Sequence, residues 1–418
     1  MTAEAITCLF LTAISLTLFL RLWLAGRQLQ SVSRHRRSVP AAFAGRFSLA
    51  DHQLAADYTQ AKVRLSQISA IVDTLLLLAL TLGGGIAWLQ SAIGYWLPAG
   101  DIIQGVALFV AVLAISGAVG LPATLYSTFV IEARFGFNRT SPGLFMLDQI
   151  KGMAVGLVLG MPLLALVLWL FVAAGAQWWL WTWLVWSGFS LAMMWLFPTV
   201  IAPVFNRFEP LQDGELKQRI DALLARCGFR SSGVFVVDGS KRSSHGNAYF
   251  TGFGAAKRIV FYDTLIRQLD PDEIEAVLAH ELGHFRLRHV AKRITVTLGL
   301  ALVLLWILGG LAMLPAFYAG LGVATPSPAA ALLLFMLVVP VLTFPFTPLA
   351  SWSSRQHEFE ADAFAAGHAS AACLVSALTK LYRDNASTLT PDPLYSAFYD
   401  SHPPAAIRIQ ALENLQPG

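Results

Sequence analysis

The sequence predicts a mainly α-helical integral membrane protein with seven spanning helices and a smaller hydrophilic part of α+β structure. The composition is the first observation: 56% of the 418 residues are hydrophobic and only 13% are charged, whereas a soluble globular chain has about 25% charged residues. The second observation is a set of seven apolar runs, each near the roughly 20 residues that a helix needs to cross a bilayer. The third is that Lys and Arg gather in alternate loops. Together these features exclude a disordered chain, a purely soluble enzyme and a protein that binds nucleic acid through a charged surface.

The apolar runs divide the chain into membrane and hydrophilic segments. They lie at 4–25, 68–90, 102–131, 153–175, 178–201, 294–319 and 328–351. The first run is leucine-rich and lacks a basic leading region, so we expect a membrane helix and not a cleaved signal peptide. The predicted organisation is five helices with their loops in 1–205, a hydrophilic segment in 206–293, two helices in 294–351 and a second hydrophilic segment in 352–418.

The distribution of basic residues predicts the orientation of the chain. Segments 91–101, 176–177 and 320–327 contain no Lys or Arg, whereas the intervening loops and both hydrophilic segments contain nearly all of them. Basic loops stay on the cytoplasmic side. We therefore expect the N-terminus outside and the C-terminus in the cytoplasm. The short loops and alanine-rich composition favour a bacterial inner membrane.

The two hydrophilic segments are expected to pack together as one domain, because each is small for a domain of its own. The first predicts a helix, a buried strand and a β-hairpin, at 215–227, at 234–237 and at 247–250 with 257–262. Asp270-Pro-Asp-Glu273 then provides an N-cap, a first-turn proline and a capping box. These residues predict a helix that continues to about His289.

This predicted helix contains His280-Glu-Leu-Gly-His284. Two histidines four residues apart share one helix face and can bind one Zn²⁺, while Glu281 projects beside them toward a water on the metal. An exposed polar helix face is the alternative interpretation of this motif alone. Catalytic zinc usually has three protein ligands, so a third ligand must come from another part of the chain.

Glu358-Phe-Glu-Ala-Asp362 predicts that third ligand. Glu358 can bind the metal, and Asp362, one helical turn later, can accept the free ring N–H of a ligating histidine. His357 is the competing ligand, but no carboxylate follows it one turn later to orient it. We therefore favour Glu358, and we expect Glu360, on another face of the helix, to be solvated.

Four other ionisable residues have weaker interpretations. His289 and His368 have no ligand partner at metal spacing, so we expect them on the surface. Arg21 is expected to extend to the cytosolic surface, with its apolar stem along the membrane. Asp73 lies in the second span, where it either lines a chamber or forms a hydrogen bond at the membrane interface.

The order of the motifs resembles that of the type I CAAX prenyl endopeptidases, integral-membrane zinc metalloproteases of the gluzincin kind. The matching runs are Phe129-Val-Ile-Glu132, Phe135-Gly-Phe-Asn138, Phe197–Pro203, Phe208-Glu-Pro-Leu211, Asn247–Phe250, Lys257–Val260, His280–His284, Glu358–Asp362 and Ser401-His-Pro-Pro404. The resemblance implies a seven-helix barrel that encloses a chamber and is capped by a cytosolic α+β zinc protease domain. It also implies a peptide or protein substrate, including substrates with a prenylated cysteine.

The resemblance further assigns roles to residues. It implies that one Zn²⁺ is bound by His280, His284 and Glu358, with Glu281 as the general base. Asp362 would be the hydrogen-bond partner of a ligand, His402 the transition-state histidine, and Arg408 the arginine that orders this region. Asn247 and Ala248 resemble the edge strand along which the substrate lies. A donor such as His402 could stabilise the oxyanion, and an edge strand could hold a peptide through its main chain.

Two other functions remain open at this point. A quality-control metalloprotease for membrane proteins would keep the chemistry and change the substrate, although such enzymes usually have fewer spans. A transporter or channel with a structural zinc cap is the alternative from another class. A structural zinc site is normally closed by four Cys or His ligands, unlike the set predicted here. Membrane lipids are expected partners in each case, and nucleic acids are not.

Overall fold

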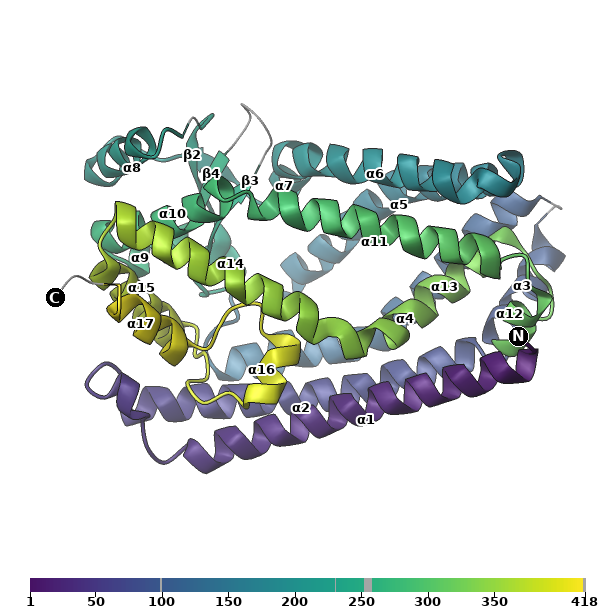
Figure 1. The fold of residues 1–418 in the computed structure, drawn as a ribbon, viewed down its shortest axis with the longest axis horizontal. Helices are drawn as coiled ribbons and strands as arrows, with labels where there is room; N and C mark the ends of the chain where they lie inside the picture. Colours follow the sequence, from purple (N-terminus) through teal and green to yellow (C-terminus); the bar gives the residue numbers. More distant parts are fainter. Residues whose placement is uncertain (98–99, 230, 252–257, 416–418) are drawn as a thin grey trace.

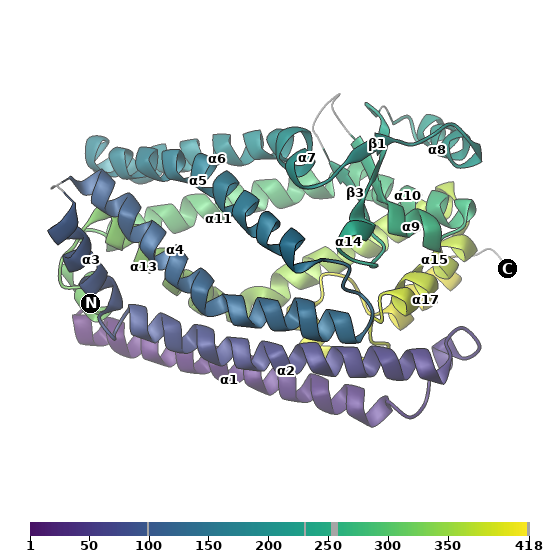
Figure 2. The ribbon, with the colours of Figure 1, turned by 180° about the vertical axis from the view of Figure 1, so that it is seen from behind.

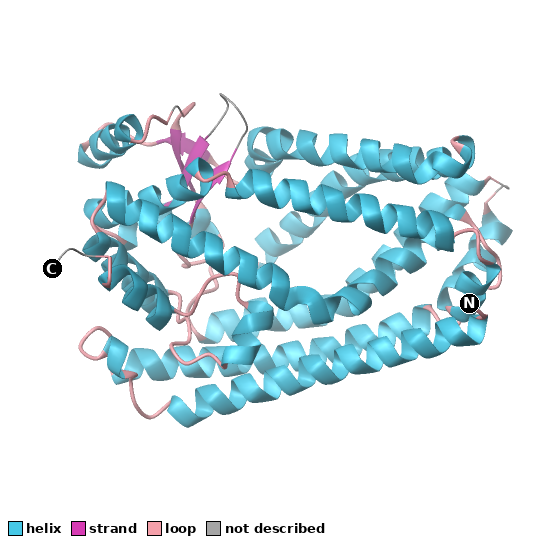
Figure 3. Ribbon diagram, in the orientation of Figure 1, coloured by secondary structure: helices cyan, strands magenta, loops and turns pink. Residues whose placement is uncertain are grey.

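The computed structural model describes residues 1–418 except 98–99, 230, 252–257 and 416–418. Long helices run along the long axis of the molecule, with the two termini toward opposite ends (Figure 1). A small sheet lies toward the end that is remote from the N-terminus, and almost everything else is helical (Figure 3). The fold is therefore mainly α, as the sequence predicts.

Seven helical segments in the described part of the chain are long and apolar enough to cross a membrane. Their bounds are Ala3–His35, Leu49–Leu80, Ile102–Glu132, Pro142–Ala173, Gly175–Phe205, His289–Leu311 and Pro328–His368. The predictions of seven spans and of a multi-pass membrane protein are confirmed.

Among the described residues, the membrane part is built from nine α-helices, two of them short, and from turns that extend or join them. They are α1 (Ala3–His35), α2 (Leu49–Leu80), α3 (Gly85–Trp96), α4 (Asp101–Tyr126), α5 (Pro142–Ala173), α6 (Trp178–Leu196), α11 (His289–Leu311), α12 (Pro315–Gly320) and α13 (Pro328–Thr343), with α3 and α12 connecting the spans at one end.

The second span lies earlier in the chain than the sequence predicts. The apolar run at 68–90 is not one helix, because α2 ends at Leu80 and α3 begins at Gly85. Gly84 between them has a left-handed conformation, with φ of 76°, which glycine adopts without steric cost. The polar first half of α2 is continuous with its apolar half, so the helix extends toward the hydrophilic end instead.

One hydrophobic core joins the helices at the end of the molecule that holds the N-terminus. Phe10, Ile86, Leu108, Leu168 and Leu334 are buried in it, and they come from five different helices. Figure 2 shows α4 and α5 across the face that lies behind α11, α13 and α14 in Figure 1. In a membrane such helices are held together mainly by van der Waals packing.

A cavity of about 650 Å³ lies among α1, α2, α4 and the bend between α13 and α14. Asp73 lines this cavity, which favours the first of its two interpretations. Arg21 also lines the cavity, and its guanidinium lies over the Phe344 ring, 4.9 Å from the centroid. Phe344 stands in the 3₁₀ turn Phe344–Phe346, where its ring attracts the cation.

In the part of the chain that the structure describes, the hydrophilic part combines four strands with eight helices. They are α7 (Ala202–Phe205), β1 (Phe208–Pro210), α8 (Glu215–Arg226), β2 (Val234–Val237), β3 (Ala248–Thr251), β4 (Arg258–Tyr262), α9 (Asp263–Gln268), α10 (Pro271–Arg286), α14 (Thr347–His368), α15 (Ala371–Asp384), α16 (Pro393–Tyr399) and α17 (Ala405–Glu413), of which α7 and the start of α14 adjoin the membrane helices.

The sheet has the strand order β1-β2-β4-β3. The pair β2–β4 is parallel, and the other two pairs are antiparallel. The predicted buried strand is β2, and the predicted hairpin is β3 with β4, in which Ala248 lies opposite Phe261. The hairpin turn falls at 252–257, outside the described residues. The strand β3 is at the edge of the sheet.

Residues from both hydrophilic segments share one hydrophobic core. Ile220, Phe261 and Leu278 come from the first segment, and Leu374 comes from the second. Phe43, in the loop between the first two spans, is also fully buried in this core. That first loop is therefore part of the packing that holds the hydrophilic domain on the membrane helices, which the sequence did not indicate.

Candidate active site

The helix α10 positions the two histidines of the HELGH motif. It begins after Asp270, and the predicted capping box is present: the Asp270 backbone N–H donates to Glu273 Oε2 at 2.9 Å. This cap fixes the start of the helix. From there the helical repeat carries His280 and His284 onto the face that α14 covers.

The close packing of α10 on α14 depends on Gly283. A Cβ atom at this position would lie 3.0 Å from the Ala361 Cα and 3.1 Å from the Ala361 carbonyl oxygen. Both neighbours are backbone atoms, so they cannot move aside as a flexible side chain could. The glycine of the motif therefore lets α10 approach the helix that carries Glu358.

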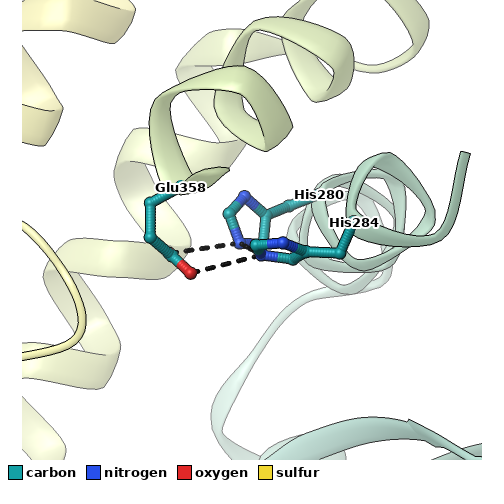
Figure 4. A group of neighbouring side chains, drawn as sticks. All are labelled: His280, His284 and Glu358. Atoms are coloured by element: carbon teal, nitrogen blue, oxygen red, sulfur yellow. Dashed lines mark hydrogen bonds and ion pairs between the residues drawn. The ribbon is translucent and has the colours of Figure 1, made fainter. Parts of the chain in front are cut away.

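Figure 4 shows His280, His284 and Glu358 pointing toward one another across the two helices. The two Nε2 atoms lie 3.1 Å apart, Glu358 Oε1 lies 3.2 Å from His284 Nε2, and Glu358 Oε2 lies 3.5 Å from His280 Nε2. Ligands about 2.0–2.1 Å from a tetrahedral Zn²⁺ are about 3.3 Å from one another. The three side chains therefore fit one zinc ion.

The carboxylate of Glu358 is buried, and its Oε2 accepts no hydrogen bond within the described part of the chain. A buried carboxylate oxygen without a hydrogen-bond donor is costly unless a cation compensates it. The cation already present is Arg408, whose Nη1 lies 3.2 Å from that oxygen. A metal ion bound by Glu358 and the two histidines would be a second compensating cation. The structure brings Glu358 to the histidines, and not the competing His357.

Asp362 and Arg408 lie directly behind the three residues. Asp362 Oδ1 is 2.8 Å from His280 Nδ1, so the ring N–H can donate to it. The Arg408 guanidinium donates to both oxygens of Asp362, at 2.8 and 2.6 Å, and Arg408 is only 5% exposed. This bidentate pair orients the carboxylate that orients the histidine.

Glu281 lies on α10 between the two histidines in sequence. It has no hydrogen-bond or ion-pair partner among the described residues, so its carboxylate is available for a proton transfer. Burial raises the pKa of Glu281 above its usual range, and the two neighbouring histidines oppose that rise. A raised pKa suits a group that must accept a proton and release it again near neutral pH.

His402 reaches the same place from the turn before α17. Its Nε2 lies 3.4 Å from Glu358 Oε1, and its Nδ1 lies 3.0 Å from the Ser401 hydroxyl oxygen. If Ser401 donates to Nδ1, the ring proton stays on Nε2, which then faces the site. The side chain is 60% exposed and lines a cavity of about 400 Å³ that Arg408 also borders.

Asn247 and Ala248 lie where the edge strand β3 begins. The Asn247 side-chain oxygen accepts from the Ala248 N–H at 2.8 Å, and the Asn247 carbonyl accepts from the Tyr262 N–H at 2.9 Å. Pairing with β4 uses one edge of β3. The other edge is the one that an extended peptide could join.

The structure corrects two expectations beside this site. The helix predicted to reach His289 ends at Arg286, and α11 begins at His289. His289 itself is not on the surface: it is 4% exposed and its Nδ1 lies 3.0 Å from His284 Nδ1. Glu360 is half exposed, as expected for a solvated group, but it lies 2.7 Å from His289 Nε2. The contact between His284 and His289 has no signal in the sequence, because residues five positions apart do not share a helix face.

We predict that Gly283→Ala weakens zinc binding and lowers stability. Alanine favours a helix over glycine by about 1 kcal/mol, but overpacking against backbone costs about 1–3 kcal/mol and separates the ligands. Zinc affinity and thermal unfolding measure the effect. Gly367→Ala in α14 is the matched control, because no atom lies within 4 Å of its added Cβ. Equal behaviour of the two variants would contradict the role given to Gly283.

Two family models match almost the whole chain. The model described as CAAX prenyl protease N-terminal, five membrane helices, matches residues 28–207. The model described as Peptidase family M48 matches residues 210–416. The division between them falls where the last of the five membrane helices meets the hydrophilic part.

Individual proteins show the same similarity. The chain is 39% identical to the CAAX prenyl protease 1 homolog of Arabidopsis thaliana, over 76% of this chain and 75% of that protein. It is 33% identical to the homolog of Caenorhabditis elegans, over 98% of each chain. The crystal structure of S. mikatae Ste24p superposes with a TM-score of 0.91 at 30% identity and covers 99% of both chains.

Proposed function

Because the chain belongs to the CAAX prenyl protease group of peptidase family M48, we propose that it is a zinc-dependent endopeptidase that cuts membrane-associated or prenylated CAAX-type peptides at the cytosolic face of the membrane. The observation that supports the zinc chemistry is the spacing of 3.1–3.5 Å among the facing atoms of His280, His284 and Glu358. Membership of a peptidase family argues against a transporter or channel with a structural zinc cap.

In this proposal the residues around the metal move one proton and stabilise one charge. A bound zinc ion supplies Lewis acidity, which lowers the pKa of water to about 7 and polarises the scissile carbonyl. Glu281 takes the proton of the attacking water and later delivers it to the leaving amine. The Nε2–H of His402 donates to the oxygen on which negative charge develops. Asp362 and Arg408 keep His280 in one tautomer and one orientation.

The substrate would bind as an added strand. The free edge of β3, beginning at Asn247 and Ala248, offers main-chain donors and acceptors to an extended peptide. Main-chain pairing accepts many side chains, so this strand alone gives little sequence specificity. The cavity lined by Arg21, Lys62 and Asp73 would keep the polar part of a membrane-bound substrate hydrated.

The orientation and the membrane are inferred from the sequence. The absence of Lys and Arg from 91–101, 176–177 and 320–327 supports an N-terminus outside and a C-terminus in the cytoplasm. In that orientation the metal centre faces the cytosol. A bacterial inner membrane stays a prediction from composition.

Removal of the metal tests the proposal. We expect 1,10-phenanthroline to abolish cleavage of a farnesylated CAAX peptide by the purified protein in detergent, and Zn²⁺ to restore it, because the ligand set would lose its ion. The same assay with the unmodified peptide measures whether the lipid is required. Cleavage that is insensitive to the chelator would overturn the zinc proposal. Equal cleavage of both peptides and of unfolded membrane proteins would favour quality control instead.

A further inference from the structure

His284 faces a second imidazole behind the metal site. Its Nδ1 atom lies 3.0 Å from His289 Nδ1, and His289 Nε2 lies 2.7 Å from Glu360 Oε2. The three groups form one line that begins at the proposed zinc ligand and ends at a carboxylate that is 50% exposed. His289, in the middle, is buried.

We propose that His289 is a positioning residue that orients the zinc ligand His284. Its ring accepts a hydrogen bond from His284 and donates one to Glu360. This inference rests on the zinc site of the proposed function. It gives His284 an indirect counterpart of the contact that Asp362 makes with His280. A partner of this kind fixes the tautomer of a ligating histidine and raises its basicity.

The proton positions follow from both ends of the line. A histidine that binds metal through Nε2 carries its proton on Nδ1, so His284 donates to the bare Nδ1 of His289. His289 then carries its own proton on Nε2, where the Glu360 carboxylate accepts it. Two Nδ1 atoms 3.0 Å apart cannot both carry a proton. The metal at one end and the carboxylate at the other select the same arrangement with both rings neutral.

A break in the helix between the two histidines allows this contact. In a continuous helix, residues five apart point in different directions. Here α10 ends at Arg286, Arg288 takes a left-handed conformation with φ of 58°, and α11 starts at His289. A non-glycine residue with positive φ is uncommon and costs free energy. The break turns His289 back onto His284.

A second metal ion is the competing use of these groups. His289, His357 and Glu360 offer ligand atoms that all lie within 4.8 Å of one another. However, the His289 and His357 rings are stacked, with centroids 4.0 Å apart and planes 11° apart. Ring nitrogens bind metal in the plane of the ring, so the lone pairs of two stacked rings run side by side and do not converge. This geometry favours a packing role for His357.

The test uses the full-length purified protein loaded with Zn²⁺. We expect His289→Leu to bind zinc about 10–100-fold more weakly, measured by competition with a fluorescent chelator, and Co²⁺ in its place to give an altered visible spectrum. His289→Asn should recover most of the affinity, because the Asn side-chain oxygen occupies the position of Nδ1 and accepts from His284. Glu360→Gln should have a smaller effect in the same direction. Since a misfolded variant would also lose zinc, circular dichroism and thermal unfolding of each variant are measured beside it.

Two controls decide between the interpretations. His368→Leu makes the same exchange on α14 at an exposed histidine and should leave zinc affinity unchanged. His357→Phe keeps the stack on His289 and should also leave it unchanged, with one zinc per chain by mass spectrometry of the metal content. A stoichiometry of two that falls to one in His357→Phe would overturn the proposal in favour of a second metal. Unchanged zinc affinity in His289→Leu would overturn it while leaving the peptidase proposal intact, whereas a wild-type chain that binds no zinc would refute the proposed function itself.

Discussion

Glu281→Gln is expected to reduce peptide cleavage by about 10²–10⁴-fold while the protein still binds one zinc ion. Glutamine has nearly the same shape as glutamate, but its amide cannot accept the proton of the attacking water. Among the described residues Glu281 forms no hydrogen bond or ion pair with the proposed ligands, so the metal should stay. Initial rates on a CAAX peptide, together with metal content, measure the two effects separately.

The matched control for this variant is Glu275→Gln on the same helix. Glu275 pairs with Arg226 at 2.6 Å, away from the metal-binding face, and loss of such a pair costs about 1 kcal/mol or less. Its turnover should be close to that of the wild type. Full activity in Glu281→Gln would remove the general-base role and with it the proposed mechanism.

Arg408→Met is expected to destabilise the protein by about 3–5 kcal/mol, because it leaves buried carboxylates without their cation. The guanidinium donates to both oxygens of Asp362 and lies 3.2 Å from Glu358 Oε2. The loss should be larger when zinc has been removed, since the metal would otherwise neutralise part of the Glu358 charge. Thermal unfolding with and without a chelator measures both quantities.

Two further variants define the cause of that effect. Arg408→Lys keeps the charge but cannot form the bidentate contact, so its stability should lie between those of the wild type and Arg408→Met. Arg383→Met removes an arginine on α15 that is 42% exposed, and it should change stability by about 1 kcal/mol or less. If Arg408→Met is no less stable than Arg383→Met, the buried charge network does not hold this region together.

Much of the fold could be predicted because its signals are local. Apolar runs of about 20 residues identify spans, and histidines at i and i+4 share a helix face wherever the helix lies. The same one-turn spacing related Glu358 to Asp362, and the structure brings both residues to the HELGH helix. The error in the second span arose because a hydropathy average does not detect a helix break such as the one at Gly84.

The parts that could not be predicted depend on contacts between distant segments or on unusual backbone. Arg408 comes from the last helix, and no spacing rule relates it to Asp362; only the family resemblance indicated it. His289 required a left-handed residue at Arg288, where neither Gly nor Pro marks a break. The contact of Arg21 with the Phe344 ring joins residues more than 300 positions apart in the chain, so no local pattern indicates it.

The helices α10 and α14 meet in space, yet α11 and α13 separate them along the chain. During synthesis the two histidines therefore emerge from the ribosome well before Glu358 does. The site of His280, His284 and Glu358 forms only after the helices α11 and α13 have inserted into the bilayer. A chain stalled in translation, or one whose last hairpin fails to insert, carries an incomplete ligand set. Newly made copies therefore lack the complete metal site until all their membrane helices have inserted.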